Sequence, residues 1–152
     1  TLTVIGDGPM RGEVRTLFSP FEADRITWLG ERSAPDIADE LRSAGIYVWP
    51  GCGEAYGLAY LEAQAAGTPV VAQATAGVPE VVADGVTGLL TADGDRKAYA
   101  DAIVALLDDA PKQRAMGRAA YDFVQEQRSL KAASKRLETI LRKHLGDVYY
   151  ER

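Results

Sequence analysis

Two glutamates on either side of a predicted helix start are the residues of this chain best suited to chemistry. Glu54 follows a loop that contains Gly51 and Gly53, and Glu62 lies eight residues later, in the second turn of a helix predicted from Leu58 to Ala66. The first backbone N–H groups of a helix have no partner within it, and they attract phosphate. A ligand that carries phosphate at this helix start could offer hydroxyl groups to a carboxylate on either side.

The segments that flank this loop predict buried parallel strands. Residues 46–49 before it are β-branched or aromatic, and residues 68–72 resume a strand after the stop signal of Gly67 and Pro69. Strand, loop, helix and strand make one βαβ unit, and open α/β sheets place ligands at the carboxyl ends of their strands. The alternative for each glutamate, taken singly, is an ordinary solvated surface residue.

The rest of the chain continues the alternation of strands and helices. Further strands are predicted over 2–5, 25–29 and 87–90, and further helices over 10–18, 35–43 and 80–83, before a helical C-terminal part. This order predicts an α/β fold: a Rossmann-like, open and mostly parallel sheet with helices on both faces and a helical C-terminal extension. We expect a Rossmann-like domain over 1–128 and a C-terminal helix and tail over 129–152.

Composition argues against several classes of protein. A net charge of −5 gives no electrostatic support for binding nucleic acid, and the only histidine, His144, makes a catalytic triad or a histidine-rich metal site improbable. The single cysteine, Cys52, cannot form an internal disulfide, which fits a reducing, cytoplasmic compartment. No Gly-x-Gly-x-x-Gly follows a predicted strand, which disfavours a nicotinamide-dependent oxidoreductase. Asp95, in the run Asp93-Gly94-Asp95, is expected to cap a helix rather than to bind a metal.

Five sequence blocks, in order and with ordinary spacing, resemble the family 4 glycosyltransferases, which are retaining enzymes of the two-domain GT-B fold. They are Val4-Ile5-Gly6-Asp7-Gly8-Pro9, Trp28-Leu29-Gly30, the Glu54 to Val71 segment with its Glu-x7-Glu pair, Gly77-Val78-Pro79-Glu80-Val81-Val82 and Gly85-Val86-Thr87-Gly88-Leu89-Leu90. The resemblance implies that the chain is the donor-binding, C-terminal half of such an enzyme. It also implies that the acceptor domain, and the first strand and helix of the donor domain with an Arg and a Lys for the diphosphate, lie outside this chain.

The resemblance also implies a role for each residue of the predicted site. Glu54 would be catalytic, facing the transferred sugar and stabilising positive charge at the reacting carbon. Glu62 would bind the ribose hydroxyls, and Arg32 would approach the base, with a solvated arginine as the alternative. The predicted donor-binding residues are Gly6, Arg32, Gly53, Ala55, Tyr56, Gly57, Leu58 and Glu62. Gly77, in a later loop, would let the backbone come close to a ligand.

The implied partners are a UDP-, GDP- or ADP-sugar donor and a glycan or lipid-linked acceptor held by the other domain. The resemblance implies no cofactor and no metal in the transfer step, and the isolated chain is expected to be weakly active or inactive. The alternative is a non-catalytic, Rossmann-like module for nucleotide binding or assembly, in which the two glutamates are vestigial.

From Leu130 onward the sequence predicts a basic amphipathic helix, in which Leu137, Ile140, Leu141 and Leu145 lie against lysines and arginines. Such a helix can lie on an anionic membrane, which would make the protein peripheral to the inner face of that membrane. The alternatives are a solvated face or, by the GT-B resemblance, a helix that crosses back to the other domain. Residues 147–152 predict a frayed tail.

Overall fold

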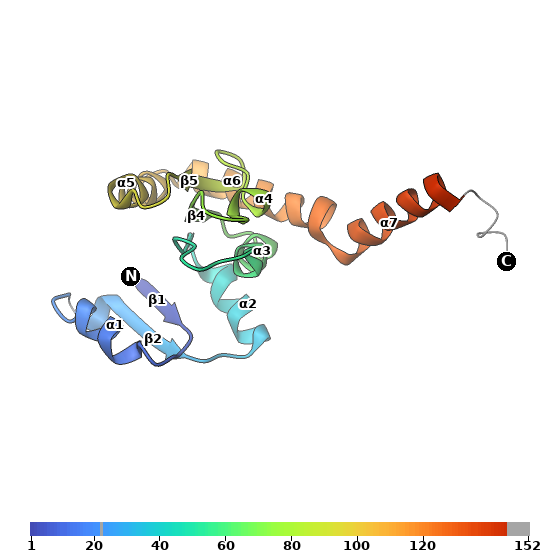
Figure 1. The fold of residues 1–152 in the computed structure, drawn as a ribbon. Coiled ribbons are helices and arrows are strands. Elements are labelled where there is room, and N and C mark those ends of the chain that lie inside the picture. Colours follow the sequence, from blue (N-terminus) through green and yellow to red (C-terminus); the bar gives the residue numbers. More distant parts are fainter. Residues whose placement is uncertain (22, 146–152) are drawn as a thin grey trace. The chain divides into compact units, whose positions relative to one another are not determined.

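The computed structural model describes residues 1–21 and 23–145. The chain forms two compact units, Thr1–Glu40 and Leu41–Arg152, and Figure 1 shows their elements coloured along the sequence. The predicted tail over 147–152 lies outside the described residues. The division predicted between residues 128 and 129 stays a prediction.

The first unit is a βαβ arrangement, and the first part of a second helix follows its second strand. Its elements are β1 (Leu2–Ile5), α1 (Arg11–Phe18), the short 3-10 helix η1 (Ala23–Arg25), β2 (Ile26–Gly30) and the first part of α2 (Ala34–Ser43). β1 and β2 are parallel. The N–H of Gly6 donates to the carbonyl of Gly30 (2.8 Å), so the carboxyl ends of the two strands lie together.

Within its described residues, the second unit contains a three-stranded parallel sheet in the order β3-β4-β5 and five α-helices beyond α2. The strands are β3 (Tyr47–Val48), β4 (Val70–Gln73) and β5 (Gly88–Thr91). The helices are α3 (Leu58–Ala65), α4 (Val78–Val81), α5 (Arg96–Leu107), α6 (Ala110–Phe123) and α7 (Leu130–Leu145), with the π-helical segment η2 (Val124–Arg128) between the last two.

Helices cover both faces of this second sheet. All four residues of the central strand β4 are buried, and its side chains alternate between the two faces. Val71 packs with Leu106 of α5 and Met116 of α6 on one face. On the other face Tyr47, the register partner of Val70, contacts the ring of Tyr60 from α3.

The predicted α/β class and the parallel pairing are confirmed. The described strands form two separate parallel sheets, β1-β2 and β3-β4-β5, where the sequence predicts a single one. Helix α4 begins at Val78, two residues earlier than predicted, because Gly77 precedes it and Pro79 fits its first turn. Asp95 caps α5 as predicted, since its carboxylate accepts the N–H of Ala98 (2.9 Å).

None of the helices within residues 1–21 and 23–145 has the length and apolar character needed to cross a membrane.

Candidate functional site

The loop that joins β3 to α3 is shaped by three glycines. Gly51, Gly53 and Gly57 all have positive φ angles, of 93°, 73° and 98°. L-residues with a side chain rarely adopt this conformation, so the sequence folds into this loop because glycine stands at each of these turns. At Gly57 a side chain would also collide with the ring of Tyr60.

Glu54 is half-buried in this loop, and its carboxylate closes the start of α3. Its own N–H donates to the carbonyl of Gly51 (3.0 Å), and its Oε1 accepts the N–H of Gly57 (2.9 Å). The Gly57 N–H, predicted to hold the donor, is therefore directed at Glu54 in this structure. The second carboxylate oxygen of Glu54 has no protein partner in the part of the chain that the structure describes.

The backbone around this carboxylate carries unused hydrogen-bond donors. Four N–H groups, those of Ala55, Tyr56, Leu58 and Ala59, have no acceptor within residues 1–21 and 23–145. The N-cap residue of α3 is Gly57, which offers no side-chain cap of its own. Unpaired N–H groups at a helix start attract anions, and the binding of a phosphate here stays a prediction.

Tyr60 anchors the helix start to the sheet. Its ring is fully buried, and its hydroxyl donates to the carbonyl of Trp49 at the end of β3 (3.0 Å). Burial raises the pKa of Tyr60 well above its ordinary value, so the phenol keeps its proton, and with it this bond, in alkaline solution as well. Tyr60 is not among the residues of the predicted site, although an aromatic residue three positions after the loop glycine is a usable signal for such a contact.

Tyr47 interacts electrostatically with both glutamates. Burial raises the pKa of Tyr47, and the negative charges of Glu54 and then of Glu62 raise it further. The phenol of Tyr47 therefore responds to the charges of both carboxylates, although Glu54 lies in the loop and Glu62 lies on helix α3. Glu62 itself is exposed, and it has no hydrogen-bond or ion-pair partner among the described residues.

A second loop, residues 74–77, lies against the first. The Cα of Gly77 packs so closely that a Cβ built there would lie 2.5 Å from the carbonyl oxygen of Ala55. The close approach predicted at Gly77 is thus made to another backbone segment of the protein. Ala76 has a φ of 44°, which is unusual for a residue with a side chain. The N–H groups of Ala76 and Gly77 also lack an acceptor in the described ranges.

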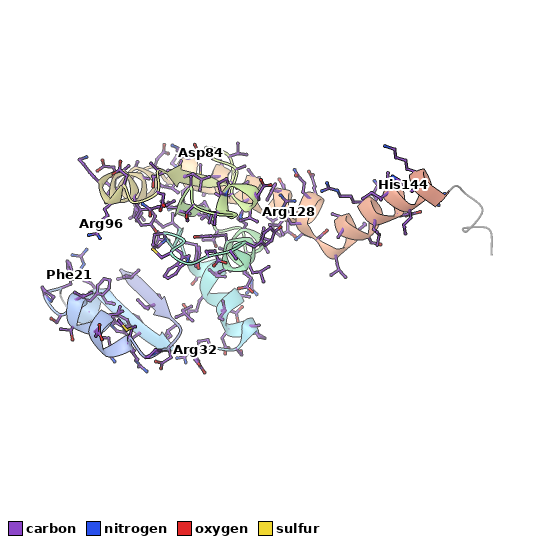
Figure 2. The ribbon with its side chains drawn as sticks, in the orientation of Figure 1. Phe21, Arg32, Asp84, Arg96, Arg128 and His144 are labelled. Atoms are coloured by element: carbon purple, nitrogen blue, oxygen red, sulfur yellow. The ribbon has the colours of Figure 1, made fainter. Side chains whose placement is uncertain are left out.

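Helix α4, which follows this second loop, is held at its end by side chains from two other helical elements. The buried side chain of Gln64, in α3, donates to the carbonyl of Val81 (2.8 Å). Arg128, at the end of η2, donates to the carbonyl of Glu80 and lies over the ring of Phe123 at 5.2 Å. Figure 2 labels Arg128 at this junction. These long-range bonds fix the segment that carries loop 74–77.

Gly6 and Arg32 belong to the first unit. Gly6 has a φ of 116° and lies beside Gly30, at the carboxyl ends of β1 and β2. Arg32 is exposed, and its guanidinium donates to the carbonyl of its neighbour Glu31 (2.9 Å). Figure 2 labels Arg32 in the segment that follows β2. Their roles toward the base and the donor stay predictions.

The side chains that could bind a metal ion are spread out over the described part of the chain. Within the described residues there is no group of three or more histidine, cysteine, aspartate or glutamate side chains that could hold an ion. Asp95 is occupied as the cap of α5, as predicted. Cys52 is free and exposed in the β3–α3 loop, which makes it a natural chemical probe of this loop.

Comparison with known proteins assigns the family. The model of the family described as glycosyl transferases group 1 matches residues 1–109. The chain belongs to the glycosyl transferases group 1 family.

Relatives of this group 1 chain share much of its sequence. It is 44% identical over 115 residues to the D-inositol 3-phosphate glycosyltransferase of Corynebacterium aurimucosum. It is 48% identical over 123 residues to the protein of the same name from an Arthrobacter species. These alignments cover 76% and 78% of this chain, but 27% and 29% of the two relatives.

Solved structures of GT-B glycosyltransferases share the fold of this group 1 chain. Sucrose-phosphate synthase from Thermosynechococcus elongatus matches with a TM-score of 0.79 and 28% identity, over 93% of this chain and 37% of that one. Anabaena HepE in complex with UDP-glucose matches with a TM-score of 0.73 and 25% identity, over 91% and 40%. The chain thus spans well under half the length of the proteins that it resembles.

Proposed function

We propose that this chain is the nucleotide-sugar-binding part of a retaining, metal-independent glycosyltransferase of family 4. The observation that carries the proposal is the start of α3, where four unpaired N–H groups lie in the loop and helix bounded by Glu54 and Glu62. Membership of the group 1 family supports it. We propose a cytoplasmic location for the enzyme, because its one cysteine is unpaired.

The diphosphate of the donor would bind to the free N–H groups of Ala55, Tyr56, Leu58 and Ala59. In the transfer step, the bond between the anomeric carbon and the diphosphate oxygen breaks, and the electron pair leaves with the diphosphate. Fixed N–H dipoles stabilise that negative charge without reorganisation. This would supply the stabilisation that a metal gives in other transferases, which supports a metal-independent reaction.

Glu54 would act on the opposite charge. The anomeric carbon becomes positively charged as the leaving group departs, and a nearby carboxylate lowers the barrier to that state. One oxygen of Glu54 is held by Gly57, which leaves the other to face the sugar. The acceptor hydroxyl would attack from the face that the diphosphate leaves, and its proton would pass to a diphosphate oxygen, so that configuration is retained.

Glu62 would accept hydrogen bonds from the ribose hydroxyls. It is exposed, unpaired within the described residues and on the same helix whose start would hold the diphosphate. The base of the donor would be uracil, guanine or adenine. HepE has been solved with UDP-glucose and with UDP, which makes uridine diphosphate the first ligand to test.

A titration tests donor binding directly. The chain is mixed with UDP, GDP or ADP, and with their glucose or mannose conjugates, while its melting temperature and NMR spectrum are followed. A response to one base that is lost in Glu62→Gln, but kept in the matched variant Glu126→Gln on η2, would support the proposal. Protection of Cys52 from alkylation by the same ligand would place the binding at the β3–α3 loop. The same titration on the parent enzyme decides the proposal, and a lack of any response there would refute it.

A non-catalytic nucleotide-binding or assembly module is the second candidate. The bond from Gly57 to Glu54 favours it, because this bond gives the glutamate a structural use without any substrate. Sugar transfer by the parent enzyme, measured with and without the Glu54 charge, separates the two candidates.

A further inference from the structure

Gln64 of helix α3 is a polar side chain that is fully buried, with an exposed fraction of 0%. Its Nε2 donates to the carbonyl of Tyr60 in the preceding turn (3.2 Å) and to the carbonyl of Val81 at the end of α4 (2.8 Å). Its Oε1 is buried as well and has no hydrogen-bond partner within the described residues. Because a buried amide oxygen without a partner costs free energy, this side chain calls for a use other than filling space.

The bond to Val81 joins α3, whose start forms the proposed donor site, to α4 (Figure 1). Val81 is the last residue of α4, and the carbonyl groups at a helix end have no partner within their own helix. Gln64 supplies that partner from α3, two residues after Glu62. The position of α4 against α3 is therefore set by a directional bond in addition to apolar contacts.

Helix α4 and the loop before it pack on the glycines of the β3–α3 loop. A Cβ placed at Gly51 would lie 2.9 Å from Cγ2 of Thr75 and 3.3 Å from Cγ2 of Val78. A Cβ placed at Gly57 would lie 3.1 Å from Cγ2 of Val81, the residue that Gln64 binds through its carbonyl. A shift of α4 would therefore move the backbone that carries the free N–H groups.

We propose that Gln64 is a positioning residue of the donor site. By holding the end of α4, it keeps the β3–α3 loop in the shape that directs its N–H groups at the diphosphate. Gln64 acts through α4 and not by touching the donor, because its side chain is fully buried. Binding groups must be held closely in place, since a displacement of about 1 Å can cost about 100-fold in rate. This role rests on the proposed function, since it concerns the same donor.

Gln64→Met in the parent enzyme tests the proposal, because methionine keeps the unbranched shape of the side chain but donates no hydrogen bond. Calorimetric titration with UDP, GDP and ADP first finds the nucleoside diphosphate that the wild-type enzyme binds. We expect the Kd of that nucleotide to rise about tenfold in the variant. The midpoint of urea denaturation should change little, because the variant loses the unpaired Oε1 together with the bond to Val81.

Thr68→Val is the matched control in the same βαβ unit. Thr68 is 2% exposed, and its hydroxyl donates to the carbonyl of Leu41 in α2 (2.5 Å). This variant also loses a buried bond, but it removes no unpaired atom that would offset the loss. We expect Thr68→Val to lower the urea midpoint and to leave the Kd of the nucleotide unchanged. The opposite responses of the two variants would separate positioning from general stability.

Alkylation of Cys52 reports on the loop without any ligand. Cys52 is free and exposed next to Gly51, on which the residues before and within α4 pack. We expect Gln64→Met to raise the rate of its reaction with iodoacetamide severalfold, because the loop is held less firmly. Thr68→Val should leave this rate unchanged. Mass spectrometry of the peptide that contains Cys52 gives the rates.

Gln64→Glu provides a rescue that depends on pH. A protonated carboxyl can donate to the carbonyl of Val81 and an ionised one cannot, and burial raises the pKa of a carboxyl. The other charged groups of the two helices are Glu62 and Glu80, which are exposed, and Arg128 bonds to the end of α4. Compared with the wild-type enzyme at the same pH, we expect this variant to bind the nucleotide almost as tightly in acid and more weakly as the pH rises.

Three outcomes would overturn the proposal. They are an equal Kd in the wild-type enzyme and Gln64→Met, a loss of binding in Thr68→Val as large as that in Gln64→Met, and an unchanged rate of Cys52 alkylation in Gln64→Met. The absence of nucleotide binding by the wild-type enzyme would instead refute the proposed function, and the role of Gln64 with it.

Discussion

Gly57 donates its backbone N–H to the carboxylate of Glu54 at 2.9 Å, so the proposed catalytic side chain also completes the start of helix α3. The bond uses one oxygen of the carboxylate and fixes the direction of the other. It joins the Glu54 side chain directly to the backbone that would bind the diphosphate. Two substitutions can therefore separate the structural role of Glu54 from its catalytic role, because one keeps this hydrogen bond without the charge and the other removes both.

Glu54→Gln in the parent enzyme should abolish most turnover while the fold stays intact. The glutamine amide oxygen can still accept the Gly57 N–H, but the negative charge that would stabilise the sugar cation is lost. We expect kcat to fall by about 10²- to 10³-fold, the size of effect known for single electrostatic groups. Glu54→Ala should also lower the free energy of unfolding, by about 1 kcal/mol, because the carboxylate bond to the Gly57 N–H is lost. Initial rates and urea denaturation measure the two effects, and wild-type turnover in Glu54→Gln would favour the non-catalytic module.

Glu62→Gln should weaken donor binding through the ribose. A hydrogen bond to a charged group contributes about 1.5–3 kcal/mol, so we expect the Kd of the matching nucleoside diphosphate to rise about tenfold or more. The same substitution should have little effect on a nucleotide that lacks the ribose 2′- and 3′-hydroxyls. Calorimetric titration of both nucleotides with both proteins gives the comparison. An equal loss for the two nucleotides would show that Glu62 does not contact the ribose.

Gly77→Ala should destabilise the second unit by disrupting the packing of loop 74–77 on the β3–α3 loop. A Cβ at Gly77 would lie 2.5 Å from the carbonyl oxygen of Ala55, so one of the loops must move. We expect a loss of about 1–3 kcal/mol in the free energy of unfolding, together with weaker donor binding. Gly8→Ala is the control, because a Cβ at Gly8 meets nothing within 4 Å. Equal stability of the two variants in urea would contradict the packing seen here.

The fold should lose stability in alkali through one buried phenol, Tyr60, and two half-buried ones, Tyr47 and Tyr99. Burial is the main cause that raises the pKa values of Tyr47, Tyr60 and Tyr99 above the ordinary value of 10.0. Above pH 10 the unfolded chain releases these protons while the folded chain keeps them, so the free energy of unfolding falls as pH rises. Below pH 10 these groups give no pH dependence.

Urea denaturation between pH 8 and pH 12 measures this effect. Tyr60→Phe should reduce the slope above pH 10, and at neutral pH it should cost about 1 kcal/mol or more because the carbonyl of Trp49 loses its donor. Tyr121→Phe, at an exposed position of α6, is the control. A slope that is unchanged in Tyr60→Phe would mean that Tyr60 ionises in the folded protein as it does in the unfolded chain.

Local patterns in the sequence were enough to predict the βαβ unit around the two glutamates. The signals that were used act on the backbone close to them in the chain, so their effect can be predicted from the neighbouring residues. They are the glycines at turns, the glycine and proline that follow a helix, and Asp95, which precedes the next helix. The helix start with free N–H groups follows from the same local rules. The strand and helix order likewise predicted the α/β class correctly.

Contacts between distant segments were decided by the tertiary structure alone. That Gly77 packs on Ala55 and that the hydroxyl of Tyr60 donates to the carbonyl of Trp49 depends on how side chains and loops fill a shared space. The periodicity of apolar residues along the sequence does not predict which of these residues come into contact. The division of the strands into two sheets is also a property of pairing across the fold. The sequence by itself thus determined the elements and the family blocks, whereas packing between residues farther apart in the chain determined how loop 74–77 and the end of β3 hold the start of α3.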